Sequence, residues 1–294
     1  MLKPITHLIM QYSKILRRVN SHPKEAVNYI RQVVSRHKKA CISCGVVEEY
    51  TIHSIDRQGI RTFQCQCCKK TWSELYGTIF YRSKIPLWKW CVALLEECIS
   101  TGACSGVELA KRVAVSHQSG WKMLTKIREG LLPTLNTTLL EGDVEGDEAW
   151  CGKKENQDIV CGFVSRTQRA IVFCLIPNVK EETLYPLVKQ YVKKKSTFYT
   201  DQRISYAATN VYYQHYTVNH SKKEFARDHH IHTNTIEHIW GDFKGIVRTI
   251  HHGISKRYRR SYLALYAFKY QHKKSSNLFY HLLSILFQPT YCLI

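Results

Sequence analysis

The sequence predicts a mixed α/β protein in which a cysteine-rich β segment and a helical segment precede a larger domain of alternating strands and helices. Three observations support this fold class. Four cysteines have metal-ligand spacing before residue 70, apolar residues recur at helical spacing over 86–130, and apolar runs alternate with helical patterns over 140–235. Hydrophobic residues make up 44% of the 294, which excludes a disordered chain.

The larger domain shows a strand order that indicates one topology. The expected elements are a first strand around Asp147, strands over 159–165 and 170–176, a helix over 181–193, a strand over 196–201 and a helix over 233–250. Three strands, a helix, a strand and a helix are the order of a ribonuclease-H-like domain. The fold class is therefore α+β or α/β, with a ribonuclease-H-like domain after the two smaller segments.

The charge of the chain predicts a polyanionic partner. Lys and Arg number 43 against 23 Asp and Glu, which gives a net charge of +20. Each basic group at a phosphate releases condensed counterions, so a polyanion such as double-stranded DNA is the expected partner. An anionic membrane is the alternative, but no apolar run is long enough to span a bilayer and no lipidation or signal-peptide pattern is present. We expect an intracellular protein, nuclear in a eukaryote and in the cytoplasm or nucleoid of a bacterium.

The cysteines predict a structural zinc site. Two CxxC pairs are separated by 20 residues, and their ligands are Cys41, Cys44, Cys65 and Cys68. Two such turns close a tetrahedron of thiolates around one Zn²⁺, which stabilises a segment too short to fold on its own core. Cys67 lies inside the second pair, and Cys68 is preferred as the ligand because it keeps the two-residue gap. The alternative is a set of buried free cysteines. The other cysteines are scattered through the chain, which indicates a reducing compartment where free thiols persist.

Residues 104–128 resemble a helix-turn-helix. Ser105 and Ser116 have the residue type that caps a helix, on either side of a turn at Ala114-Val115. The first helix carries Val107, Leu109 and Val113, and the second turns Trp121, Leu124 and Ile127 inward. The exposed face of the second helix then offers DNA His117, Gln118, Ser119, Lys122 and Lys126. An ordinary helical hairpin in a core is the alternative.

Three carboxylates carry the expected chemistry. Asp147 lies in the first strand, Asp201 ends a later strand and Glu237 lies in the helix that opens at Thr233. In the expected topology they meet at one end of the sheet, where they hold two Mg²⁺ or Mn²⁺ ions about 4 Å apart for phosphodiester chemistry. Glu148 points to the other face of the strand, where it either supports a metal ligand or is structural. The alternative is three solvated surface acids, although a charge in an apolar strand is costly.

These motifs together resemble the Merlin-type DDE transposases and their bacterial insertion-sequence relatives over roughly residues 40–275. The likeness lies in CISCG…FQCQCCKKTWSELYGTIF, PLWKW, VEGDEAWCGKK, YTDQ and HTNTIEHIWGDFK. It implies that Asp147, Asp201 and Glu237 are catalytic, with 36 positions between the last two, and that Lys244 contacts a DNA phosphate, although a solvated lysine fits the spacing equally. Some relatives use an Asn in the third block, so Asn234 is a rival ligand. The glycine usual after the second cysteine pair is Lys69 here.

The resemblance implies cut-and-paste transposition. The chain would bind terminal inverted repeats, cleave them and join the freed 3′ ends to target DNA, as a homodimer or larger homo-oligomer because two ends are held together. His230, His232 and His238 flank the third acid and either bind phosphate or serve as ordinary polar groups. The alternatives are a non-catalytic or domesticated zinc-ribbon regulator and a ribonuclease-H-fold nuclease that cuts without joining.

The expected segments follow from these motifs. They are an N-terminal helical segment 1–38, broken near residues 21–23, a zinc ribbon 39–80, a helix-turn-helix-like region 86–132, a ribonuclease-H-like DDE domain 140–275 and a C-terminal helical tail 276–294.

Overall fold

The computed structural model of the chain divides into two compact units, residues 1–130 with 274–294 and residues 131–273. The structure describes residues 13–15, 17, 27, 28, 31, 40–100, 102–201, 213–218, 231–273, 275 and 277–287. Most of the N-terminal helical segment expected over 1–38 lies outside these residues. Among the described residues, no helix is both long enough and apolar enough to cross a membrane.

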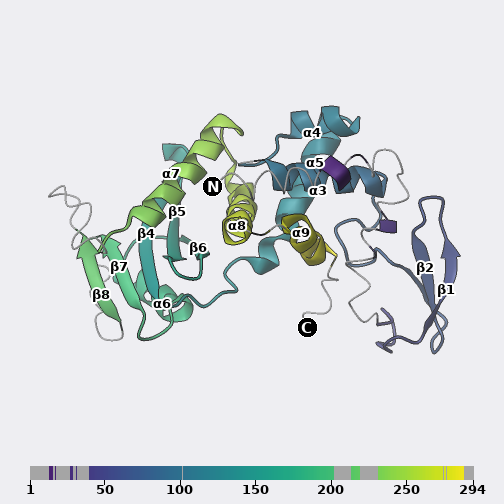
Figure 1. The fold of residues 1–294 in the computed structure, drawn as a ribbon, viewed down its shortest axis with the longest axis horizontal. Coiled ribbons are helices and arrows are strands. Elements are labelled where there is room, and N and C mark those ends of the chain that lie inside the picture. Colours follow the sequence, from purple (N-terminus) through teal and green to yellow (C-terminus); the bar gives the residue numbers. More distant parts are fainter. Residues whose placement is uncertain are drawn as a thin grey trace. The chain divides into compact units, whose positions relative to one another are not determined.

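A five-stranded sheet forms the centre of the unit 131–273 (Figure 1). The strands are β4 (Asp143–Cys151), β5 (Asp158–Ser165), β6 (Ala170–Ile176), β7 (Thr197–Asp201) and β8 (Gln214–Val218). They lie in the order β6-β5-β4-β7-β8. The pairs β4–β5 and β5–β6 are antiparallel, whereas β4–β7 and β7–β8 are parallel. The expected mixed α/β class is therefore confirmed.

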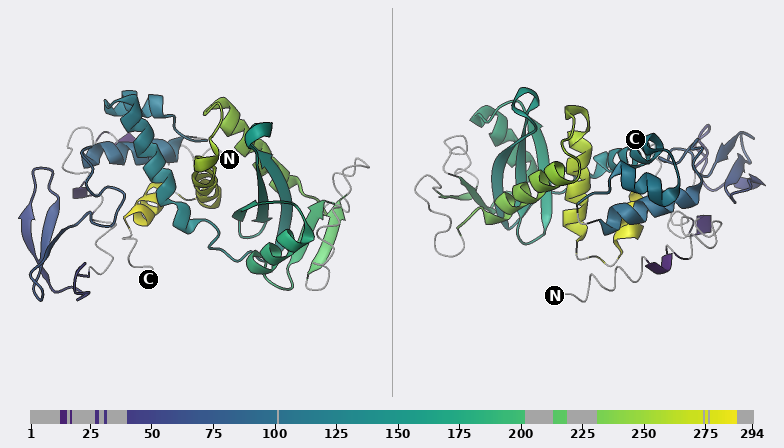
Figure 2. Two further views of the ribbon diagram at one scale, coloured as in Figure 1. Left: turned by 180° about the vertical axis from the view of Figure 1, so that it is seen from behind. Right: turned by 90° about the horizontal axis from the view of Figure 1, so that it is seen from above.

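Helices cover both faces of this sheet, which explains why β5 and β6 are apolar on both sides. Helix α6 (Glu181–Tyr191) packs Leu184 into one cluster with Phe163 of β5. Helix α7 (Asn234–Thr249) packs on β4 and β5, and α8 (Lys256–His272) packs on β6. The next residue along β5, Gly162, faces α7, since a Cβ there would lie 2.6 Å from the Trp240 ring. Figure 2 shows α7, in yellow-green, running alongside the strands.

The other unit contains a small antiparallel sheet next to the cysteine pairs. Its strands are β1 (Tyr50–Ile55), β2 (Arg61–Cys65) and β3 (Thr71–Ser73), in that order. Three aromatic rings, Tyr50, Phe63 and Trp72, pack together with centroid separations of 4.8–5.9 Å. Such a small cluster cannot by itself stabilise a segment of this length, which leaves a stabilising role for metal binding.

The described part of that unit also contains helices. They are α3 (Leu87–Ile99), α4 (Gly106–Val113), α5 (His117–Gly130) and α9 (Leu278–Leu286). A buried ion pair joins α3 to α5, because Arg128 Nε lies 2.8 Å from Glu97 Oε1. The same two side chains bind the backbone of Cys104, which precedes α4. Helix α9 packs on α3 and α5, so the C-terminal helix belongs to this unit.

Candidate functional site

The three predicted acids lie together in a small pocket of the unit 131–273. The pocket has a volume of about 190 Å³ and is lined by Asp147, Asp201, Thr233 and Glu237. Asp147 comes from the middle of β4, Asp201 is the last residue of β7 and Glu237 lies in the first turn of α7. Because β4 and β7 are adjacent parallel strands, residues that are 54 positions apart in the sequence become neighbours.

The crowding of these acids changes their electrostatics. Burial raises the pKa of Asp147 to about 7, with further contributions from the charges of Glu148, Asp201 and Glu237. A half-buried carboxyl beside like charges holds its proton up to a higher pH than usual unless a cation offsets the repulsion. The pocket therefore has the oxygen donors and the negative charge that suit a hard divalent cation.

The start of α7 orients the third acid. The Thr233 hydroxyl donates a hydrogen bond to Glu237 Oε1 at 2.6 Å. Asn234, the rival ligand, is exposed and is not among the described residues that line the pocket. Thr233 escaped the sequence analysis, although a threonine at the start of a helix, four residues before an acid, is a recognisable signal.

A buried polar network holds the start of α7 against β4. Glu145, fully buried on the same face of β4 as Asp147, accepts the Ile236 backbone N–H at 2.9 Å and pairs with Arg166 Nε at 2.6 Å. Arg166 also donates to the His232 carbonyl oxygen at 2.6 Å, and its guanidinium lies 4.2 Å from the Tyr199 ring centroid. The sequence analysis missed Glu145 and Arg166. An acid two residues before Asp147 in an apolar strand was the available signal.

The remaining residues predicted near the acids have separate places. Glu148 is buried, His232 belongs to the network of Glu145, and exposed His238 lies 3.7 Å from Asp242 one turn along α7. His230 lies outside the described residues. Lys244 is exposed and lines a second pocket beside the acid pocket.

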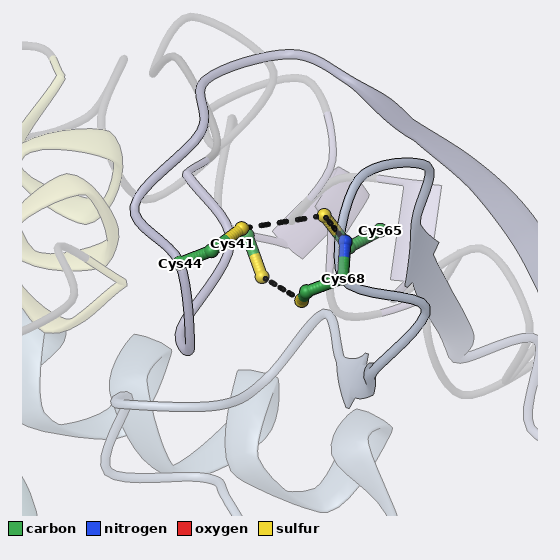
Figure 3. Close-up of side chains that lie close together, drawn as sticks. All are labelled: Cys41, Cys44, Cys65 and Cys68. Carbon is green, nitrogen blue, oxygen red and sulfur yellow. Dashed lines mark hydrogen bonds between the residues drawn. The ribbon is translucent and has the colours of Figure 1, made fainter.

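The four predicted zinc ligands converge in the other unit (Figure 3). The sulfur atoms of Cys41, Cys44, Cys65 and Cys68 all lie within 4.8 Å of one another. Cys41 and Cys68 are 3.5 Å apart and Cys44 and Cys65 are 3.6 Å apart, close to the sulfur separation of about 3.8 Å in a tetrahedral zinc–thiolate site. Backbone N–H groups, that of Cys44 foremost, lower the pKa of the Cys41 thiol to about 6, whereas desolvation and the neighbouring thiols raise the pKa of Cys44 to about 12. Metal binding requires thiolates at both positions, and a bound cation would offset this crowding.

The second cysteine turn keeps its shape without the usual glycine. Lys69 takes a left-handed conformation with φ 58°, and its N–H donates to the Cys65 carbonyl at 3.1 Å. Gly45 has the same geometry in the first turn, with φ 74° and a hydrogen bond to the Cys41 carbonyl. Cys67 is exposed and lies outside the cluster, as expected from the spacing.

Two helices joined by a short turn, α4 and α5, occupy the segment 104–128 where a helix-turn-helix is expected. Ser105 accepts the Glu108 N–H, Ser116 accepts the Ser119 N–H, and Ala114 ends α4 in the left-handed region. Leu109, Val113, Leu124 and Ile127 are buried, Trp121 is partly buried, and Val107 is 49% exposed rather than part of the core. Of the side chains predicted to contact DNA, His117, Gln118, Lys122 and Lys126 are exposed on α5, whereas Ser119 is partly buried.

Comparison with known proteins assigns the chain to a family. Residues 139–271, which contain all three acids, match the family described as the ISXO2-like transposase domain. An uncharacterized transposase-like protein of Haemophilus influenzae is 34% identical over 90 residues, which are 30% of this chain and 71% of that protein. The chain belongs to the ISXO2-like transposase family. The resemblance to insertion-sequence DDE transposases is thereby confirmed.

Among solved structures, the ISXO2-like transposase matches the cryo-EM structure of the simian T-cell lymphotropic virus intasome in complex with PP2A regulatory subunit B56 gamma. The TM-score is 0.33 at 11% identity, and the match covers 56% of this chain and 65% of that chain.

Proposed function

We propose that this transposase cuts DNA at the ends of its element and joins the freed ends to target DNA, with Asp147, Asp201 and Glu237 as catalytic residues. The observation that carries the proposal is the acid pocket. Among the described residues, it is lined by these three acids and Thr233. The sheet also supports a ribonuclease-H-like domain, since three antiparallel strands are followed by a helix, two parallel strands and a further helix.

The donor set of the pocket suits two Mg²⁺ or Mn²⁺ ions, because carboxylate oxygens are preferred by hard cations and no His or Cys contributes among the described lining residues. Such ions supply Lewis acidity and an activated water for phosphodiester cleavage. The protein's part is to hold the three carboxylates at one end of the sheet. Thr233 orients Glu237, and the Glu145 network holds the helix that carries it.

DNA binding is proposed for the other unit. The exposed residues His117, Gln118, Lys122 and Lys126 on α5 form a face suited to phosphates and base edges. The four-cysteine cluster fits one structural Zn²⁺, which would hold the ribbon in shape for a DNA or protein partner. Because two element ends are handled together, a homodimer or larger homo-oligomer is expected.

The test uses duplexes that carry the inverted repeats read from the DNA on either side of the gene. With Mg²⁺, the chain should cleave uncut ends and, in a second assay, join pre-cut ends to a plasmid. Cleavage without joining would favour a nuclease. Specific binding with neither reaction would favour a non-catalytic regulator.

The choice of third ligand is tested by two variants side by side. Glu237→Gln removes a pocket carboxylate and should abolish cleavage, whereas Asn234→Ala changes an exposed side chain and should leave cleavage within a few-fold of the wild type. The reverse pattern would transfer the ligand role to Asn234.

A further inference from the structure

A second, larger pocket lies beside the acid pocket in the unit 131–273. Its volume is about 760 Å³, within the range of about 300–1,000 Å³ common for sites that enclose an organic ligand. It shares two elements with the acid pocket, since it is built on the end of β4 and the C-terminal half of α7, together with the segment that joins α7 to α8. None of the predicted catalytic acids lines it.

The rim of this pocket is basic. Lys153, Lys244 and Arg248 line it and are exposed, and among the described residues none of the three forms an ion pair. Arg259 also lines it but is held by Asp158 at 2.6 Å. No Asp or Glu belongs to the described lining. These three positive charges repel one another, and an anionic ligand would relieve that repulsion. The rim therefore favours an anionic ligand.

The inner wall of the pocket is apolar. Phe243, Val247 and Ile254 line it, and Phe243 is buried. The backbone turns sharply at Gly253, with φ 119°, and the Gly253 N–H donates to the Val247 carbonyl at 3.1 Å, which ends α7 beside the pocket. A free phosphate would leave this wall unused. A ligand that combines a phosphate with a flat apolar ring system uses both parts.

The spacing from the acid pocket indicates where that ligand comes from. Lys244 follows Glu237 by seven residues on α7, a distance of about 10 Å along the helix axis. Cys151, which lines the pocket, follows Asp147 by four residues on β4, about 13 Å along the strand. Stacked nucleotides advance about 3.4 Å each, so the pocket lies a few nucleotides from a phosphate held at the acids.

We propose that this pocket takes one unstacked nucleotide of the bound DNA, a few positions from the cleaved phosphodiester. Its base lies against Phe243, Val247 and Ile254, and its phosphates lie at Lys153, Lys244 and Arg248. Extruding a base costs stacking energy, which contacts in such a pocket offset. The inference rests on the proposed function, since it assumes that the acid pocket holds a phosphodiester.

The test places 2-aminopurine, whose fluorescence rises when it leaves the base stack, at each position within four nucleotides of the junction. The full chain carries Asp201→Asn so that the DNA stays intact. One position should brighten severalfold on binding. Val247→Trp, which fills the pocket, should abolish that rise, and Ile254→Ala should weaken it while binding in a gel-shift assay falls by no more than about tenfold.

The salt dependence of DNA binding tests the basic rim independently, and a second arginine serves as a matched control. Arg248→Gln should reduce the slope of log binding constant against log salt by about one. Arg257→Gln removes the same charge from an exposed position of α8 outside the described lining and should change the slope less.

The proposal is overturned if no position brightens although the DNA is bound, if the rise persists in Val247→Trp, or if the two arginine variants behave alike. These failures differ from failure of the proposed function, in which the wild-type chain binds or cuts no element ends with Mg²⁺.

Discussion

At the residue scale, the buried pair of Glu145 and Arg166 explains how Glu237 is held in place beside the other two pocket acids. Glu145 is inaccessible to solvent, yet its two oxygens bind a guanidinium and a helix N–H. A buried acid with this set of partners fixes where α7 begins relative to β4. The position of Glu237 therefore depends on a residue that does not line the acid pocket.

Glu145→Gln should destabilise the protein by about 3 kcal/mol, since it removes the carboxylate that pairs with the largely buried Arg166. Urea denaturation measures the free energy of unfolding. Glu141→Gln is the control, because its pair with Lys193 is exposed and its loss should cost less than about 1 kcal/mol. Equal losses in the two variants would contradict the role given to Glu145.

The raised pKa of Asp147, about 7, predicts a pH dependence of metal binding. A folded-state pKa above the unfolded value means that metal-free stability falls as pH rises toward 7, and a bound cation offsets this cost. Because proton and cation compete for the carboxylate, Mn²⁺ affinity measured by calorimetry should rise up to about tenfold from pH 6 to pH 7 and level off near pH 8. A flat profile, or one unchanged in Asp147→Asn, would show that another group controls binding.

At the scale of elements, the sequence pattern predicted most of the sheet and its helices. The apolar runs over 159–165 and 170–176 correspond to β5 and β6, and the helix expected over 181–193 is α6, Glu181–Tyr191. Such elements are readable because burial on both faces demands unbroken apolar runs. Strand β8, Gln214–Val218, was not anticipated. It lies at the edge of the sheet with alternating polar residues and is defined by pairing with β7.

Some residues of the candidate site could likewise be predicted from the sequence, whereas others could not. Asp147, Asp201 and Glu237 could be found because acids are scarce in this chain and these three lie in or beside apolar elements. Arg166 could not, because its role depends on contacts with Glu145 and His232, which are distant in sequence.

Packing between β5 and α7 yields an element-scale prediction. In Gly162→Ala the new Cβ would meet the Trp240 ring at 2.6 Å, which pushes α7 from the sheet and should destabilise the protein by about 1–3 kcal/mol. Gly241→Ala is the matched control, since nothing lies within 4 Å of its Cβ and alanine favours a helix. Thermal unfolding compares them. A neutral Gly162→Ala would contradict the close approach of α7 to β5.

At the scale of the whole molecule, the four-cysteine cluster and the acid-lined pocket lie in different units. The two sites suit different metals. Thiolates suit a structural Zn²⁺ ion, whereas carboxylates suit hard ions such as Mg²⁺. Removing Zn²⁺ should therefore leave metal binding at the acid pocket intact, and removing Mg²⁺ should leave the cysteine-containing segment folded.

Cys68→Ser should lower the zinc content measured by mass spectrometry and unfold the ribbon, because one of four thiolates is lost. Cys67→Ser should retain a full zinc ion, since Cys67 lies outside the cluster. Loss of zinc in Cys67→Ser with retention in Cys68→Ser would reassign the fourth ligand.

The most direct test of the central claim is Mg²⁺-dependent cleavage of a labelled inverted-repeat duplex by the wild type and by Asp201→Asn, with binding followed in parallel. Asp201 is the acid at the end of β7 and lines the acid pocket. Loss of several kcal/mol of charge stabilisation predicts cleavage at least about a thousandfold slower, with DNA affinity unchanged within a few-fold. Cleavage at the wild-type rate by Asp201→Asn would contradict the account.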